Sequence, residues 1–133
     1  MNSEFQDKKP ITSFRDLIVY QNTYNSMLKV MKEVIPKLPE CEKYDLKDQI
    51  SRSCKAVPRL IAEGYAKRQQ KAGFRKYIED AMAECNETMV SLMQGRDIYN
   101  LDAELINSLV NIYDISGRQL YMLAEKWRTF ERK

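Results

Sequence analysis

The chain has 133 residues, 44% of them hydrophobic, and a net charge of +3, as expected for one globular domain with a modest core. No apolar run approaches the roughly 20 residues of a membrane-spanning helix, and the first residues lack the apolar segment of a secretory signal. These features exclude membrane and secreted classes, so we expect a cytoplasmic protein without membrane contact.

Histidine is absent, and the three cysteines, Cys41, Cys54 and Cys85, show no CxxC spacing. The absence of histidine excludes Ser–His and Cys–His nucleophilic sites and histidine-based zinc or di-iron sites. An odd number of scattered cysteines is typical of a reduced cytoplasmic chain. We therefore expect no enzymatic activity, no metal site and no cofactor.

Apolar residues recur at spacings of three and four in four successive segments, and no segment reads convincingly as a strand. Short connections join these segments. The pattern predicts an all-α, antiparallel, up-down-up-down four-helix bundle over residues 13–133. Residues 1–12 are expected to form a mobile N-terminal lead-in.

The first helix is predicted from Ser13 to Ile35, with Ser13 and Asp16 forming its N-terminal cap. Pro36 ends it, because proline cannot continue the backbone hydrogen-bond ladder. The predicted core-facing stripe of this helix is Phe14, Leu17, Ile18, Tyr24, Leu28, Met31 and Ile35.

The second helix is predicted from Asp45 to Arg68. Its predicted core-facing stripe is Leu46, Ile50, Cys54, Val57, Ile61 and Gly64. Pro58 lies inside this pattern, where its ring crowds the carbonyl of Cys54, so we expect a proline kink in one continuous helix. Gly64 has no phosphate-loop motif around it, which favours a close-packing role.

The third helix is predicted from Gly73 to Asn100, and the fourth from Asp102, as its cap, to Phe130. The predicted stripe of the third is Phe74, Tyr77, Ile78, Ala81, Cys85, Leu92 and Tyr99. The predicted stripe of the fourth is Leu105, Leu109, Ile112, Ser116, Leu120, Leu123, Trp127 and Phe130.

These two helices carry more apolar residues than one stripe can bury. The surplus residues are Met82, Met89, Val90, Met93, Ile106, Val110, Tyr113 and Tyr121. Such a surplus predicts an oligomer interface between copies of the chain. Rotation of the helices, or coverage by N-terminal residues, is the alternative explanation.

Residues 52 to 76 hold a concentration of positive charge, net +7, because Glu63 is the one acid among eight basic residues. The eight basic residues are Arg52, Lys55, Arg59, Lys67, Arg68, Lys71, Arg75 and Lys76. One interpretation is a solvated helix face in which Glu63 bridges Arg59 and Lys67. Another is a surface that binds the phosphates of RNA or DNA.

Two further groups have ordinary structural explanations. Asp80, Glu84 and Glu87 share one helix face, but no Glu-x-x-His motif accompanies them, so a solvated acidic face is favoured over a metal site. Most of the tyrosines lie at core spacing. Tyr65, beside the basic residues, is the candidate for stacking on a nucleic-acid base.

Four segments together resemble the four helix bundle proteins, including those encoded in intervening sequences of bacterial 23S ribosomal RNA genes. These segments are FRDLIVYQ (14–21), YDLKDQISRS (44–53), VPRLIAEGYAKR (57–68) and FRKYIEDAMAECNE (74–87). The family motif residues present are Pro58, Ile61, Ala62, Glu63 and Gly64. The resemblance implies a four-helix bundle that assembles as a homopentamer and has no known enzymatic activity.

Some relatives of this family are accessory proteins of diversity-generating retroelements, which work with a reverse transcriptase and nucleic acid. We therefore expect a non-catalytic, homo-oligomeric accessory protein that binds RNA or DNA through its basic residues. The alternative is a protein-interaction scaffold that binds an acidic partner, such as a polymerase or reverse transcriptase, without touching nucleic acid.

Overall fold

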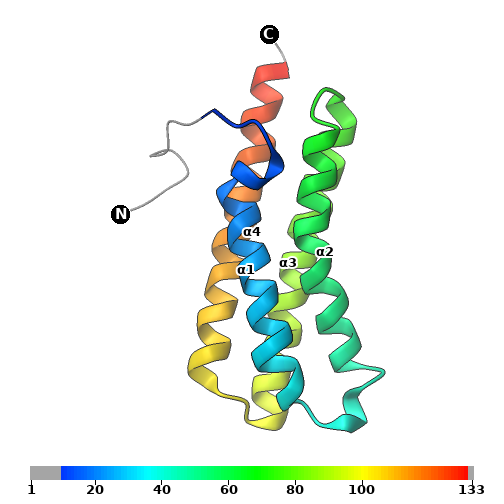
Figure 1. Ribbon diagram of the computed structural model, residues 1–133, viewed down its shortest axis with the longest axis vertical. Helices are drawn as coiled ribbons and strands as arrows, with labels where there is room; N and C mark the ends of the chain where they lie inside the picture. The colour runs from blue at the N-terminus through cyan, green and yellow to red at the C-terminus, as the bar shows by residue number, and fades with distance from the viewer. Residues whose placement is uncertain (1–9, 132–133) are drawn as a thin grey trace.

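The computed structural model describes residues 10–131, except for the side chains of Lys71 and of residues 127–131. The helices are α1 (Ile18–Lys29), α2 (Leu46–Ala66), α3 (Lys71–Tyr99) and α4 (Ala103–Glu131). Figure 1 shows the chain running down α1, up α2, down α3 and up α4. The described residues contain no strand, so the predicted all-α four-helix bundle is confirmed.

The chain enters the bundle through a short 3-10 turn, Phe14–Asp16, and not through the first turn of α1. The predicted cap is present, because the Asp16 carboxylate accepts from the backbone N–H of Ser13 at 3.1 Å. Leu17 then adopts an extended conformation (φ −75°, ψ 125°), which breaks the predicted continuous helix. The predicted lead-in falls mainly on residues 1–9, outside the described part of the chain.

The buried face of α1 and of the π-helical turn that continues it, Val30–Val34, differs from the predicted stripe. It consists of Val19, Thr23, Ser26, Val30 and Val34. The larger Tyr24 of the predicted stripe is 41% exposed. Thr23 is buried without penalty because its hydroxyl donates to the Val19 carbonyl at 2.8 Å. Small side chains therefore take the fully buried positions, whereas Leu17, Met31 and Ile35 of the predicted stripe are partly buried against the core.

The predicted stripe of α2 is confirmed throughout, since Leu46, Ile50, Cys54, Val57, Ile61 and Gly64 are all buried. Pro58 lies buried inside a helix that continues from Leu46 to Ala66, and a bend there stays a prediction. A Cβ atom added to Gly64 would lie 3.2 Å from side-chain carbons of both Tyr77 and Ile78. Gly64 is therefore a point of close approach between α2 and α3.

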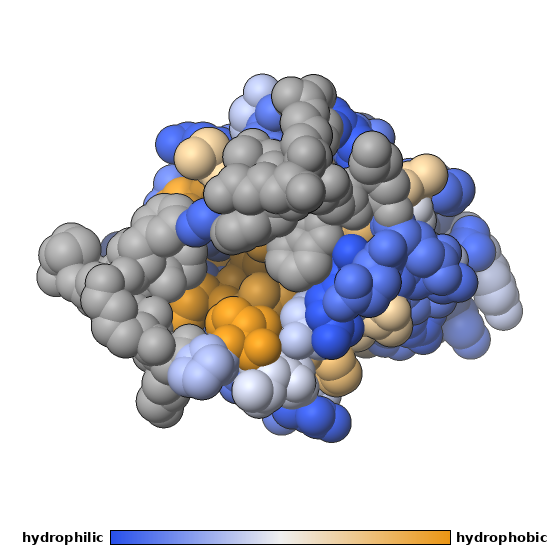
Figure 2. Space-filling model, turned by 90° about the horizontal axis from the view of Figure 1, so that it is seen from above, coloured by the Kyte–Doolittle hydropathy of each residue, from blue (hydrophilic) through white to orange (hydrophobic). Residues whose placement is uncertain are grey.

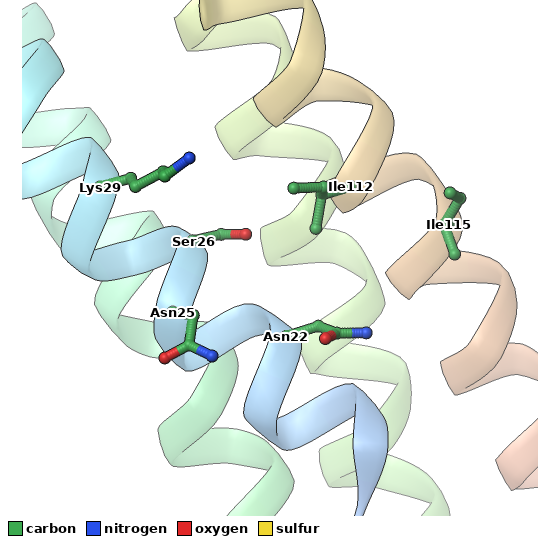
Figure 3. A pocket seen from close by; sticks show the side chains of 6 residues that line it. All are labelled: Asn22, Asn25, Ser26, Lys29, Ile112 and Ile115. Carbon is green, nitrogen blue, oxygen red and sulfur yellow. The ribbon is translucent and has the colours of Figure 1, made fainter. Parts of the chain in front are cut away.

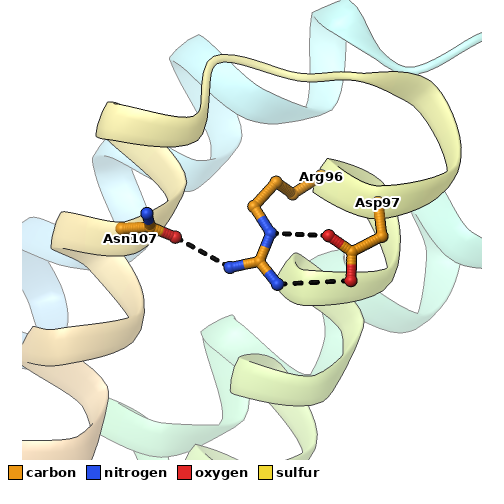
Figure 4. A network of polar contacts seen from close by, with 3 residues as sticks. All are labelled: Arg96, Asp97 and Asn107. Atoms are coloured by element: carbon orange, nitrogen blue, oxygen red, sulfur yellow. Dashed lines mark hydrogen bonds and ion pairs between the residues drawn. The ribbon is translucent and has the colours of Figure 1, made fainter.

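Polar contacts join α3 to α4 at the end where the chain turns between them. Asn100 ends α3 in the left-handed conformation (φ 53°). The Asp102 carboxylate then accepts from the backbone N–H of Glu104 at 3.0 Å, which confirms the predicted cap. Arg96 of α3 binds the Asp97 carboxylate and donates to the Asn107 side chain of α4 at 2.7 Å (Figure 4).

The core face of α4 is rotated relative to the predicted stripe. It consists of Ile106, Leu109, Tyr113, Ser116, Leu120 and Ala124. Ile106 and Tyr113 are fully buried inside the single chain, so their assignment to an oligomer interface is wrong. The predicted stripe and the observed buried face of α4 both have helical spacing. Packing against α3 and α1 therefore selects which residues turn inward.

The opposite end of the bundle carries the turn between α2 and α3. Figure 2 looks down on this end and shows hydrophilic residues gathered on the side of that turn, with hydrophobic residues visible toward the middle of the view. Within the described residues, none of the helices has an apolar stretch long enough to cross a membrane.

Candidate nucleic-acid interface

Three of the predicted cations lie on the outer face of α2. Arg52, Lys55 and Arg59 are spaced three and four residues apart and are exposed. They point outward because the opposite stripe of the same helix is buried in the core. Burial of one face of α2 therefore leaves Arg52, Lys55 and Arg59 in a row along the opposite, exposed face.

Few of these charges are neutralised. Arg52 pairs with Asp48 of the preceding turn at 3.3 Å. Lys55 and Arg59 form no ion pair with any residue that the structure describes, and the predicted bridge from Glu63 to Arg59 and Lys67 is not formed there. Lys55 and Arg59 are therefore the cations most available to an external anion.

Unlike Lys55 and Arg59, the cations at the start of α3 form ion pairs. Arg75 pairs with Glu79 at 2.9 Å and with Glu125 of α4 at 3.6 Å. Lys76 pairs with Asp80 at 3.1 Å. These hydrogen bonds to acids raise the pKa of both Arg75 and Lys76. The net charge of residues 52–76 overstates the positive surface, because the neutralising acids follow immediately in the sequence.

The remaining predicted cations lie in the turn between α2 and α3 and at the first residue of α3. Lys67 is exposed, whereas the side chain of Lys71 lies outside the described part. The Arg68 guanidinium lies 4.1 Å from the centre of the Tyr65 ring and donates to the Tyr65 carbonyl at 2.9 Å. One face of the predicted base-stacking tyrosine is thus already covered by Arg68.

A groove of about 510 Å³ runs between α2 and α3 beside the outer cations. It is lined by Gln49, Ser51, Arg52, Ser53, Lys55, Ala56, Arg59, Glu84 and Glu87. Beneath it, the Thr88 hydroxyl of α3 donates to the Ser53 hydroxyl of α2 at 2.8 Å. This buried contact links α2 to α3 below the groove.

Sequence reasoning did not assign Glu84 and Glu87 to this surface. Burial raises the pKa of the Glu84 carboxyl, and the nearby charges of Glu87 and Asp80 add to that effect. The helical spacing placed these acids together on α3, but their position opposite the α2 cations depends on how the two helices pack.

The family motif of α2 is chiefly a packing element. Pro58, Ile61 and Gly64 are buried, and Ala62 is half-buried. Glu63 is exposed at the edge of the outer face. The motif therefore positions the basic surface, because it sets how closely α2 packs against α3.

Two other hollows differ in character. The hollow between α1 and α4 has a volume of about 300 Å³ and a polar wall facing an apolar one (Figure 3). Its lining residues are Asn22, Asn25, Ser26, Lys29, Ile112 and Ile115. The hollow between α3 and α4, of about 490 Å³, is lined by Met82, Asn86, Asp114, Gly117, Arg118, Tyr121 and Met122. Neither offers a row of cations.

The buried thiols are poor nucleophiles. Burial raises the pKa of Cys54 to about 11 and that of Cys85 to about 12, so both are protonated at neutral pH. Among the described residues, no group of three potential metal-ligand side chains comes together. Of the three hollows described above, the groove between α2 and α3 is the one lined by a row of cations.

Residues 15–122 match the family described as 23S rRNA-intervening sequence protein. A comparison with curated proteins found no match. The matched range includes the outer face of α2, the groove and the packing motif around Pro58, and the family description names no chemical reaction. With its all-helical fold, the chain belongs to the 23S rRNA-intervening sequence protein family.

Proposed function

We propose that this protein is a non-catalytic, homo-oligomeric accessory protein that binds RNA or DNA through the outer face of α2. The observation that carries the proposal is the row of Arg52, Lys55 and Arg59, in which Lys55 and Arg59 have no ion-pair partner among the described residues. Cations held exposed and unpaired on a rigid helix are suited to phosphate contacts.

The spacing of the row fits a phosphate backbone. Residues 52 to 59 span about 10 Å along the helix axis, at about 1.5 Å per residue. Because each strand of a duplex winds around its axis, successive phosphates lie further apart than the axial rise of about 3.4 Å, so the row reaches about two phosphates. Such contacts position a strand without reading its sequence, and they weaken as salt concentration rises.

Self-association would multiply this small number of contacts. Of the predicted interface residues, Val90 is 49% exposed and Tyr121 is 54% exposed. Met82, Met89, Met93 and Val110 are half-buried on the same two helices, and Met122 is 54% exposed beside them. We propose that a second copy covers this apolar face and that the assembly is a homopentamer, as the family resemblance implies.

Cellular location and partners complete the proposal. Cys41, Cys54 and Cys85 are free thiols, which supports a reducing, cytoplasmic environment. A second candidate, a scaffold for an acidic protein such as a reverse transcriptase, draws support from the same exposed apolar residues Tyr121 and Met122. Protein partners that stay bound after nuclease treatment in high salt would favour the scaffold.

Two charge-matched variants test the nucleic-acid proposal. The double substitution Lys55→Gln and Arg59→Gln removes two unpaired cations, whereas Arg75→Gln and Lys76→Gln removes two paired ones. Both lower the net charge by two, so long-range attraction is equal. Fluorescence anisotropy should show about 30-fold weaker binding and a salt slope smaller by about 2 for the first variant, with less than about threefold loss for the second.

Folding of both variants is checked by circular dichroism before binding is measured. Equal losses in the two variants would show that general charge, and not the row on α2, governs binding. Failure of the unaltered protein to bind RNA or DNA at low salt would overturn the proposed function.

A further inference from the structure

The groove between α2 and α3 has walls of opposite charge. Arg52, Lys55 and Arg59 line the α2 side, and Glu84 and Glu87 line the α3 side. No ion pair crosses the groove among the residues that the structure describes. The carboxylates on α3 therefore do not neutralise the cations on α2 by direct pairing, and a ligand in the groove can contact both sides.

The α3 wall is suited to accept hydrogen bonds from a ligand. Ionised carboxylates are acceptors only, and they repel phosphate. Burial raises the pKa of the Glu84 carboxyl, and repulsion from the charges of Glu87 and Asp80 adds to that effect. A neutral or cationic group that donates hydrogen bonds to Glu84 would relieve this repulsion.

A nucleotide in a single strand carries both kinds of group that the groove requires. Its phosphate is an anion, and its exposed base edge is available for hydrogen bonds. Cytosine, adenine and guanine present exocyclic amino donors, whereas uracil presents two carbonyl acceptors around one N–H. In a duplex the base-pairing edges are hidden, so a single strand is the form that fits.

We propose that the groove binds single-stranded nucleic acid, with phosphates on the α2 cations and base edges toward Glu84 and Glu87. These two carboxylates select bases that carry exocyclic amino groups over uracil. The selectivity rests on the proposed function, since it concerns the same surface. The groove volume of about 510 Å³ is adequate for one nucleotide, being within the usual range of about 300–1,000 Å³ for ligand sites.

Two RNA oligomers of equal charge test the selectivity. Oligocytidylate and oligouridylate of about 12 nucleotides carry the same phosphates, so phosphate contacts cancel in the comparison. The experiment runs at about pH 7.5, well above the ordinary pKa of a glutamate carboxyl. The unaltered protein should bind the cytidylate about fivefold to tenfold more tightly, as expected for carboxylates that accept from cytosine amino groups.

The double substitution Glu84→Gln and Glu87→Gln should abolish this preference, chiefly by tightening the binding of oligouridylate. The control substitutions Glu33→Gln and Glu104→Gln remove two acids outside the groove and give the same net charge. They should keep the preference. Retention of the preference in the Glu84→Gln and Glu87→Gln protein would overturn the assignment.

The possible failures are distinguishable. Tight but equal binding of both oligomers by the unaltered protein would overturn the base selectivity and leave the proposed function standing. Binding of neither oligomer, at low salt and with the fold verified by circular dichroism, would overturn the selectivity together with the nucleic-acid function.

Discussion

The two sides of α3 are built differently, and two glycines show the contrast. On the α2 side, a Cβ added to Gly64 would lie 3.2 Å from carbons of Tyr77 and Ile78. On the α4 side, a Cβ added to Gly117 would meet no atom within 4 Å. At Gly64 the α2–α3 seam is closed, although a groove opens elsewhere along it, whereas Gly117 borders the open, apolar hollow between α3 and α4.

This difference separates two roles. The closed seam, with its buried Ser53–Thr88 hydrogen bond, holds charged side chains at fixed positions beside a groove. The open side leaves Tyr121 and Met122 each 54% exposed, which suits contact with another copy. Specific ligand contacts are thus expected on the rigid side and assembly on the open side. The following predictions test that division.

The largest effect is expected from opening the assembly. The substitutions Tyr121→Ser and Met122→Ser remove apolar surface from the α3–α4 hollow, so the protein should sediment as a monomer at micromolar concentration. Its affinity for a long nucleic acid should fall at least about tenfold, because the copies no longer bind together. The Lys55→Gln and Arg59→Gln protein should keep the assembly of the unaltered protein. An unaltered protein that already sediments as a monomer would contradict this division.

Substitution of the glycine in the closed seam should have the next largest effect. Gly64→Ala forces a methyl group against Tyr77 and Ile78, and overpacking of this kind costs about 1–3 kcal/mol. The gain in helix propensity returns up to about 1 kcal/mol. The free energy of unfolding, measured with urea, should therefore fall. An equal or higher value would show that α2 and α3 can separate without cost.

The matched substitution on the open side should act in the opposite direction. In the Tyr121→Ser and Met122→Ser protein, where no second copy covers this face, Gly117→Ala places a methyl group in open space, so the helix-propensity gain stands alone. The free energy of unfolding should rise by about 0.5–1 kcal/mol in the same urea measurement. A decrease would contradict the open space beside Gly117.

The smallest effect is expected in the core between the two sides. The Tyr113 hydroxyl is buried without a hydrogen-bond partner among the described residues, and burial raises its pKa. Tyr113→Phe removes this unsatisfied group and keeps the ring. The free energy of unfolding should stay constant or rise by up to about 1 kcal/mol, and a thermal melt would detect a marked fall that contradicts the assignment.

Part of the candidate site could be predicted because its determinants are local. The α2 stripe was correct in every position, since one helix period separates its buried face from Arg52, Lys55 and Arg59. The neutralisation of Arg75 and Lys76 by Glu79 and Asp80 was not predicted, although acids at i+4 face cations on the same helix and could have indicated it.

By itself, the sequence determined the four helices, the caps at Ser13 and Asp102 and the charged face of α2, because these depend on neighbours within one or two turns. Only the tertiary structure decided that Ile106 and Tyr113 turn inward and that Glu84 faces the α2 cations. Apolar residues recur at helical spacing on more than one face of α4, so packing against neighbouring helices decides which face is buried. The groove exists only where two helices meet, at an angle and separation that no single segment encodes.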